Sequence, residues 1–345
     1  MNNRKCYFAA ANGFGGFKSN FTSVFSSKLL DKLFVIKGGP GTGKSTLMRR
    51  IEENYRDKMD TSTILCSSDT ASVDGILIRH NGVTLGMVDG TSPHILEPKY
   101  PGAVEVIVNL GDGFDTEGLR RRKNEIIDIS ESKKREYEKA YDMLAIAGDI
   151  SKHIRCYFSD SIKYNEAENI IYSDFEAKES SVFNCKISPF FVGAFCKNGY
   201  TRISEFSENR RRVAIRGDGL SEYFLLSHIA KILTERSIPF ELFPSAFSDD
   251  MPDMICTCDA VYYASDEYAE AVDSSAFFDK GNEYIDALEM YKRCLEMSRK
   301  SFERASEYHF KLEEIYSKLM RFEENEKKYI DIVNRIDGIF TNNVD

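Results

Sequence analysis

The chain has 345 residues, of which 42% are hydrophobic and 29% are charged, and its formal net charge is −9. At about 150 residues per domain this length predicts two domains, and because no apolar run approaches the about 20 residues of a membrane helix, we expect no contact with a membrane. The negative charge argues against a broad nucleic-acid surface, and the N-terminal apolar patch is too short for a secretory signal, so the cytoplasm is the expected location.

The first glycine-rich segment is AsnGlyPheGlyGlyPhe, at residues 12–17. Glycine clusters of this kind mark loops. We interpret the segment as a loop, and folding of that loop over a bound nucleotide is the alternative interpretation.

A complete phosphate-binding loop (P-loop), GGPGTGKST, occupies residues 38–46. Its context fits, because an apolar segment typical of a strand precedes it and a good helix start follows it. Glycines let backbone N–H groups wrap the phosphates, the lysine reaches the β- and γ-phosphates, and the next hydroxyl binds Mg²⁺. A tight turn without a ligand would not need the lysine and serine. The candidate residues for binding ATP are Gly38, Gly39, Gly41, Thr42, Gly43, Lys44, Ser45 and Thr46, with Ser45 as a ligand of Mg²⁺.

A second magnesium ligand is expected at the end of another buried strand. The predicted strand ValThrLeuGlyMetValAsp ends at Asp89, which is the candidate Walker B carboxylate and, with Lys44, a candidate catalytic residue. Asp69, after the preceding strand, is the competing metal ligand. Gly90 stands where many ATPases have a glutamate that polarises water, so the sequence predicts nucleotide binding without an evident hydrolytic base. His94 is either a γ-phosphate sensor or a turn residue.

An internal similarity links the two halves of the chain. A shift of 179 positions aligns residues 33–47 with residues 212–226, and a slightly larger shift aligns Phe8 with Phe191. Similarity at a fixed shift predicts a duplicated unit. We therefore expect residues 1–179 to form a P-loop nucleotide-binding domain and residues 180–345 to form a degenerate P-loop-like repeat.

The loop of the second copy has changed its chemistry. Glu222, Tyr223 and Phe224 replace the glycine, lysine and serine of the first loop. A carboxylate and two aromatic rings cannot supply the ammonium and the hydroxyl that a triphosphate needs. We expect the second copy to fold like the first but to bind no nucleotide.

Each copy ends in a stretch of apolar residues with 3-4 spacing, which is typical of amphipathic helices. We expect helical arms at about residues 116–165 and 279–336. Such helices need partners. Packing of the arms against each other is the favoured interpretation, and self-association or binding of another protein is the alternative.

Four motifs carry a resemblance to a known family: YFAAANGFGGF near the N-terminus, KGGPGTGKSTLM at the loop, CysSerSerAsp at 66–69 and AspGlyThrSerProHis at 89–94. With them the chain resembles a bacterial family of tandem P-loop ATP-binding, ATPase-like proteins. The resemblance implies a cytosolic protein with two related halves and supplies no substrate. Relatives often keep a second P-loop, from which this chain departs at residues 222–224.

We therefore predict an α/β protein with a duplicated P-loop NTPase fold, in which mostly parallel sheets are flanked by helices and long helical arms. The expected function is binding of ATP with Mg²⁺ at a single N-terminal site, with slow or partner-stimulated hydrolysis. A P-loop kinase that passes the γ-phosphate to a small acceptor, with Asp69 as base, is one alternative, and a scaffold that never hydrolyses its nucleotide is the other. The sequence leaves open whether Arg79, Arg211 or Arg216 reaches the γ-phosphate.

Overall fold

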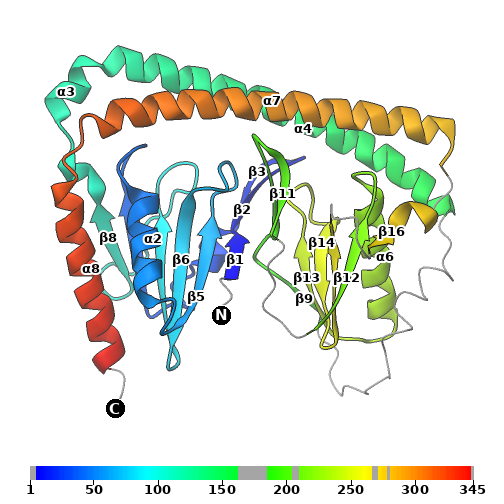
Figure 1. The fold of residues 1–345 in the computed structure, drawn as a ribbon, viewed down its shortest axis with the longest axis horizontal. Coiled ribbons are helices and arrows are strands. Elements are labelled where there is room, and N and C mark those ends of the chain that lie inside the picture. The colour runs from blue at the N-terminus through cyan, green and yellow to red at the C-terminus, as the bar shows by residue number, and fades with distance from the viewer. Residues whose placement is uncertain (1–4, 162–184, 204–209, 266–270, 278–279, 343–345) are drawn as a thin grey trace.

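The computed structural model describes residues 5–161, 185–203, 210–265, 271–277 and 280–342. Two six-stranded sheets, both mostly parallel, lie side by side beneath a pair of long helices (Figure 1). The predicted α/β class is therefore confirmed. The predicted boundary between residues 179 and 180 lies outside the described residues.

The first sheet has the strand order β1-β5-β6-β7-β4-β8. Its strands are β1 Lys5–Phe8, β5 Asp60–Leu65, β6 Val73–His80, β7 Val83–Asp89, β4 Lys32–Lys37 and β8 Glu105–Asn109. Strand β6 runs antiparallel to both its neighbours, and all other neighbours are parallel. The predicted strands into the P-loop and up to Asp89 are thus β4 and β7, which are direct neighbours.

The second sheet has the strand order β16-β12-β15-β14-β13-β9. Its strands are β16 Val272–Asp273, β12 Arg211–Arg216, β15 Ala260–Ala264, β14 Pro252–Cys256, β13 Phe240–Pro244 and β9 Cys185–Ile187. Strand β14 again runs antiparallel to both its neighbours, and the rest are parallel. Taken from β9 to β16, the order and the directions of the strands repeat those of the first sheet from β1 to β8.

A two-stranded hairpin accompanies each sheet. The strands are β2 Ala10–Gly13 with β3 Gly16–Ser19, and β10 Gly193–Cys196 with β11 Gly199–Arg202. The segment 12–17, predicted as a loop, is therefore the turn and inner ends of β2 and β3. The reason is that Asn12 pairs with Phe17 across the hairpin, so only Phe14 and Gly15 remain between the strands.

The described helices cover the faces and the upper edges of the sheets. They are α1 Phe21–Val24, α2 Lys44–Tyr55, α3 Thr116–Arg121, α4 Lys123–Ser161, α6 Ser221–Glu235, α7 Asn282–Ser317 and α8 Glu323–Asn342, with short 3-10 helices η1 Leu110–Gly113 and η2 Ser274–Phe277. Helices α2 and α6 follow β4 and β12 in the same way, which gives both halves a strand, turn and helix.

The helices α4 and α7 pack against each other along their length and span both sheets (Figure 1). They are antiparallel, because Arg304 contacts Glu136 at 2.7 Å while Glu283 contacts Tyr157 at 3.1 Å. The packing of the arms against each other is therefore confirmed. Helix α4 buries Leu144 and Ile154 in the core of the second half. Residues 162–165 of the first predicted arm lie outside the described residues.

The second predicted arm is two helices rather than one. The chain leaves α7 after Ser317 and turns into α8, which lies along the first sheet (Figure 1). There Ile332, Ile336 and Phe340 pack with side chains of α2 and the first sheet in one buried cluster. The pattern of apolar residues predicted the helices, but it carried no signal for this return, because an apolar stripe does not specify which surface will cover it.

Candidate functional site

The P-loop lies at the carboxyl end of β4, and α2 begins at Lys44. Helix α2 is anchored by Leu47, Met48 and Ile51, which are buried in the core of the first half. Gly41 and Gly43 have φ values of +67° and +85°. Residues with a Cβ adopt such values only with strain. Glycine is therefore required at these two positions of the loop by the backbone itself.

Lys44 lies across the loop that it follows. Its Nζ donates to the carbonyl oxygens of Gly38 at 2.8 Å and Gly39 at 2.9 Å, and it lies 3.6 Å from Oδ2 of Asp89. Asp89 is at this position because Ile36 pairs with it across the parallel strands β4 and β7. The structure thus brings the lysine and the predicted Walker B carboxylate together.

The hydroxyl and carboxylate proposed as magnesium ligands have protein partners of their own. Oγ of Ser45 accepts from the backbone N–H of Val73 at 2.9 Å. Oδ1 of Asp89 accepts from the backbone N–H of Thr91 at 2.9 Å and from its hydroxyl at 2.5 Å. These bonds orient both groups, while Oδ2 of Asp89 faces Lys44. Of the other loop hydroxyls, Thr42 donates to the carbonyl of Gly39 at 2.9 Å.

Asp69 lies beside the loop but in another setting. It forms an ion pair with Lys197 of the second half at 3.1 Å, and Oδ1 accepts from the backbone N–H of Ala71 at 3.2 Å. The turn that carries Asp69 connects β5 to Val73, whose N–H contacts Ser45. Asp69 is thus near the predicted metal side of the site, but a lysine from the other half neutralises it.

The packing around Gly90 leaves little room for a side chain. A Cβ on Gly90 would lie 2.4 Å from Cγ1 of Val35, which is closer than any real contact. A glutamate at this position would therefore require the side chain of Val35, or the strand that carries it, to shift. The sequence has a glycine after Asp89, where many ATPases have a glutamate, and the packing against Val35 favours this small residue.

His94 lies in a buried cluster with Asp74 of β6 and Phe21 of α1. Its Nε2 lies 3.1 Å from Oδ2 of Asp74, and its ring stacks on Phe21 with 4.2 Å between centroids. Cys66 is a neighbour of Asp74: burial raises the pKa of its thiol, and the carboxylate of Asp74 raises it further. Sequence reasoning considered His94 alone and missed Asp74, which no motif marks.

The C-terminal helices cover the outside of the P-loop. A Cβ on Gly41 would lie 2.6 Å from the carbonyl oxygen of Glu313, at the end of α7. Nδ2 of Asn325, in α8, donates to the carbonyl of Thr42 at 2.8 Å. The loop is therefore held between its own sheet and the turn from α7 to α8, a contact across more than half of the sequence that no local pattern predicts.

Both long helices also bring charge to the loop. Burial lowers the pKa of Lys133, in α4, and the ammonium of Lys44 lowers it further. A hydrogen bond from His309 lowers the pKa of Glu313, and the charge of Lys44 acts in the same direction. Lys44 thus has a cation from α4 and a carboxylate from α7 within electrostatic range, and the sequence identified neither.

The three candidate arginines lie away from the loop. Arg79 lies in β6, where it pairs with Asp60 of β5. Val73, which contacts Ser45, is at the other end of β6. Six residues of extended chain separate Arg79 from Val73, a distance of about 20 Å. Arg211 begins β12 of the second sheet. Arg216 forms an ion pair with Asp273 at 3.0 Å, also in the second half.

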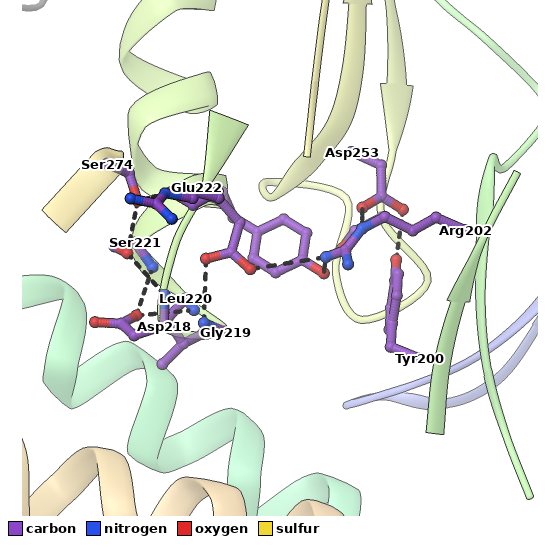
Figure 2. Close-up of polar contacts among 12 residues, drawn as sticks. Tyr200, Arg202, Asp218, Gly219, Leu220, Ser221, Glu222, Asp253 and Ser274 are labelled. Carbon is purple, nitrogen blue, oxygen red and sulfur yellow. Dashed lines mark hydrogen bonds and ion pairs between the residues drawn. The ribbon is translucent and has the colours of Figure 1, made fainter. Parts of the chain in front are cut away.

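The loop at residues 217–221 of the second half corresponds in position to the P-loop, and its N–H groups are bound by side chains of the protein (Figure 2). Oδ1 of Asp218 accepts from the backbone N–H groups of Leu220 at 3.3 Å and Ser221 at 3.1 Å, and Oε2 of Glu222 accepts from that of Gly219 at 3.1 Å. These amides correspond to those that would contact phosphate in the first loop. The carboxyl groups of Asp218 and Glu222 therefore occupy loop N–H groups that a phosphate would need.

The other requirements of a phosphate site are also missing from this loop. Tyr223, at the lysine position, is buried and accepts a hydrogen bond from Nη2 of Arg202 at 2.7 Å. Ile215 pairs with Ala264 across β12 and β15, as Ile36 pairs with Asp89 across β4 and β7. Ala264 thus stands at the position of the predicted Walker B carboxylate, Asp89. The sequence shift of 179 positions did not reveal this correspondence, because the hairpin of β14 and β15 is shorter than that of β6 and β7.

A cavity of about 710 Å³ lies elsewhere, between α4, the turn of β2 and β3, and the second half. Residues 13–17 of the glycine-rich segment line it, but no residue of the P-loop does, and neither do Asp69 and Asp89. The charged side chains on its walls include two ion pairs, Lys18 with Asp249 and Arg155 with Asp250. We therefore centre the candidate site on the P-loop rather than on this cavity.

Comparison with family models, curated proteins and solved structures finds no match to the chain. The resemblance to tandem P-loop ATP-binding proteins thus stays a prediction. Among the described residues, no helix combines the length and the apolar character needed to cross a membrane.

Proposed function

We propose that the chain binds a nucleoside triphosphate, ATP with Mg²⁺, at the P-loop of its first half and hydrolyses it slowly or when a partner stimulates it. The observation that carries the proposal is the meeting of Lys44 and Asp89, 3.6 Å apart, at the ends of adjacent parallel strands. A lysine for the phosphates next to a carboxylate for the metal is the arrangement that P-loop chemistry requires.

The residues at the loop suit both ligands. The amides between Gly38 and Thr46 would hold the phosphates, and Lys44 would exchange its two carbonyl contacts for phosphate oxygens. Ser45 and Asp89 would hold Mg²⁺, which keeps several of its six positions for water and phosphate oxygens and needs few protein ligands. When bound, the metal would neutralise charge on the phosphates.

Slow hydrolysis is favoured over phosphotransfer to a small acceptor. The kinase alternative assigns Asp69 as base, but the carboxylate of Asp69 already forms an ion pair with Lys197 and accepts from the backbone N–H of Ala71. Hydrolysis without a glutamate after Asp89 is expected to be slow, because Gly90 leaves no group there to orient water. A partner that inserts such a group would accelerate the reaction.

We propose further that the two halves arose by duplication and that the second is a partner without a nucleotide of its own. The identical order and directions of the strands support this, as does the equivalent placing of α2 and α6. The internal carboxylates of Asp218 and Glu222, and Ala264 at the metal position, argue against a second nucleotide.

Titration calorimetry of the whole chain with MgATP, followed by a phosphate-release assay, tests the proposal. We expect one nucleotide per chain and a slow release of phosphate without any acceptor. Absence of binding would refute the proposal. Two nucleotides per chain would refute the assignment of the second half, and phosphate transfer only in the presence of an acceptor would favour the kinase alternative.

A further inference from the structure

The hairpin β10–β11 of the second half reaches across to the first half. Its turn carries Lys197, between Cys196 and Gly199. Nζ of Lys197 lies 3.1 Å from Oδ2 of Asp69 and 3.3 Å from Oγ of Ser306 in α7. The side chain is only about one fifth exposed. A cation of the second half is therefore held inside the junction, next to the turn that follows β5 of the first half.

The base of this hairpin is fixed by the polar network of the second half (Figure 2). Arg202, opposite the turn, lies between Tyr223 and Asp253, and Tyr200 donates to Asp253. At the turn itself, the backbone carbonyl of Lys197 accepts from Nη1 of Arg299 at 3.1 Å. The position of Lys197 is thus set by rigid contacts at both ends of the hairpin, as a group that acts on a ligand requires.

The environment of Lys197 connects it to the P-loop. Asp69, its partner, and Lys44, the loop lysine, both act electrostatically on Glu313 of α7. The turn of Asp69 ends at Val73, whose N–H contacts Ser45. Lys197 therefore approaches the predicted metal and phosphate side of the site from the half opposite to the loop.

The turn of the hairpin β2–β3 in the first half corresponds to the turn that carries Lys197, and its chemistry differs. Hairpin β2–β3 reaches into the second half in the same way, but its turn carries Phe14, which stacks on Phe247 with 4.9 Å between ring centroids. Phe247 in turn contacts Tyr223, the residue at the lysine position of the second loop. The turn of β2–β3, directed at the loop of the second half, thus carries the apolar Phe14. The turn of β10–β11, directed at the first half, carries the cation Lys197.

We propose that Lys197 is a second cation of the nucleotide site, supplied by the second half, and that it recognises the terminal phosphate of the bound triphosphate. The proposal rests on nucleotide binding at the P-loop. The loop amides and Lys44 would hold the phosphates from the first half, and Lys197, beside Asp69 and Ser306, would meet the terminal phosphate from the second half. The ammonium has three donors, so it can contact the phosphate while it keeps its contact with Asp69.

The test measures binding of MgATP and MgADP to Lys197→Ala in the full chain. We expect the variant to lose about tenfold in affinity for MgATP, the size of one charge-assisted hydrogen bond, and to bind MgADP as the wild type does. Lys197→Arg should retain the preference for MgATP. An equal loss for both nucleotides, or no loss for either, would overturn the proposal.

Lys18→Ala is the matched control, because Lys18 also forms an ion pair between the halves, with Asp249, but away from the P-loop. It should leave the affinities for both nucleotides unchanged. If it lowers MgATP affinity as much as Lys197→Ala does, the effect comes from the junction and the proposal fails. Failure of the wild type to bind MgATP refutes the proposed function itself, whereas binding that Lys197→Ala leaves intact refutes only this inference.

Discussion

Phe8 and Phe191 face each other across the junction of the two halves, and each donates its backbone N–H to the carbonyl of the other at 2.9 Å. The internal similarity of the sequence aligns these same two residues. Reciprocal pairing of equivalent residues is the mark of a two-fold arrangement. The junction therefore has a local two-fold relation, which supports the proposed duplication and explains why each hairpin reaches into the opposite half.

Replacement of Lys44 by alanine should weaken binding of MgATP by about 10- to 150-fold while the fold is kept. The change removes a charge-assisted phosphate contact worth about 1.5 to 3 kcal/mol. Titration calorimetry measures the binding, and circular dichroism reports the fold. Lys32→Ala, at the other end of β4, where the ammonium contacts the carbonyl of Gly102 at 3.0 Å, is the control and should bind normally. Unchanged affinity in Lys44→Ala would mean that the loop is a structural turn.

Replacement of Asp89 by asparagine should weaken nucleotide binding much more with magnesium than in EDTA, because the carboxylate is proposed to act through the metal. A loss of about tenfold or more is expected with magnesium present. Asp69→Asn should lack this dependence on magnesium, since Asp69 is paired with Lys197. If the two variants exchange their behaviour in the binding assay, the metal ligand has been assigned to the wrong strand.

Replacement of Glu222 by glutamine should remove a pH dependence of stability. Burial raises the pKa of Glu222 to about 7, whereas the unfolded value is about 4.3. Between these values the folded chain binds more protons than the unfolded chain, so this contribution is fully present below about pH 4 and is lost as the pH rises through 7, by up to about 3 kcal/mol.

Urea unfolding of both forms at pH 5 and pH 8 measures this effect. The wild type should lose more stability between the two pH values than Glu222→Gln, whose side-chain oxygen can still accept from Gly219. Glu235→Gln, at an exposed position of the same helix, should behave like the wild type. Equal pH dependence in all three proteins would contradict the role given to Glu222.

Replacement of Ile336 by alanine should destabilise the chain by about 2 to 4 kcal/mol, as expected for a large-to-small change in a packed core. Ile336 is 1% exposed, between α8 and the first half. Ile330→Ala, on the same helix but 52% exposed, should change the stability by no more than about 0.5 kcal/mol. Denaturant unfolding followed by circular dichroism compares them, and similar losses would mean that α8 does not depend on this packing.

The sequence by itself determined the local parts of the candidate site. The strand, turn and helix around Lys44 follow from apolar periodicity and glycine placement, and the strand that ends at Asp89 follows from the same pattern. The counterpart of this unit at residues 211–235 was also predicted, because the apolar pattern of residues 33–47 recurs at residues 212–226. Such signals depend on neighbours within a few residues and need no knowledge of the rest of the chain.

Only the tertiary structure decided which distant groups meet at the loop. Lys197 contacts Asp69 from 128 positions away, and Asn325 contacts Thr42 from 283 positions away. Neither residue carries a motif, because a lysine in a turn or an asparagine in a helix has the same local pattern whether it meets a phosphate loop or solvent. Their positions follow from the packing of the long helices and from the two-fold junction, where burial of apolar faces, rather than local backbone preference, selects the arrangement.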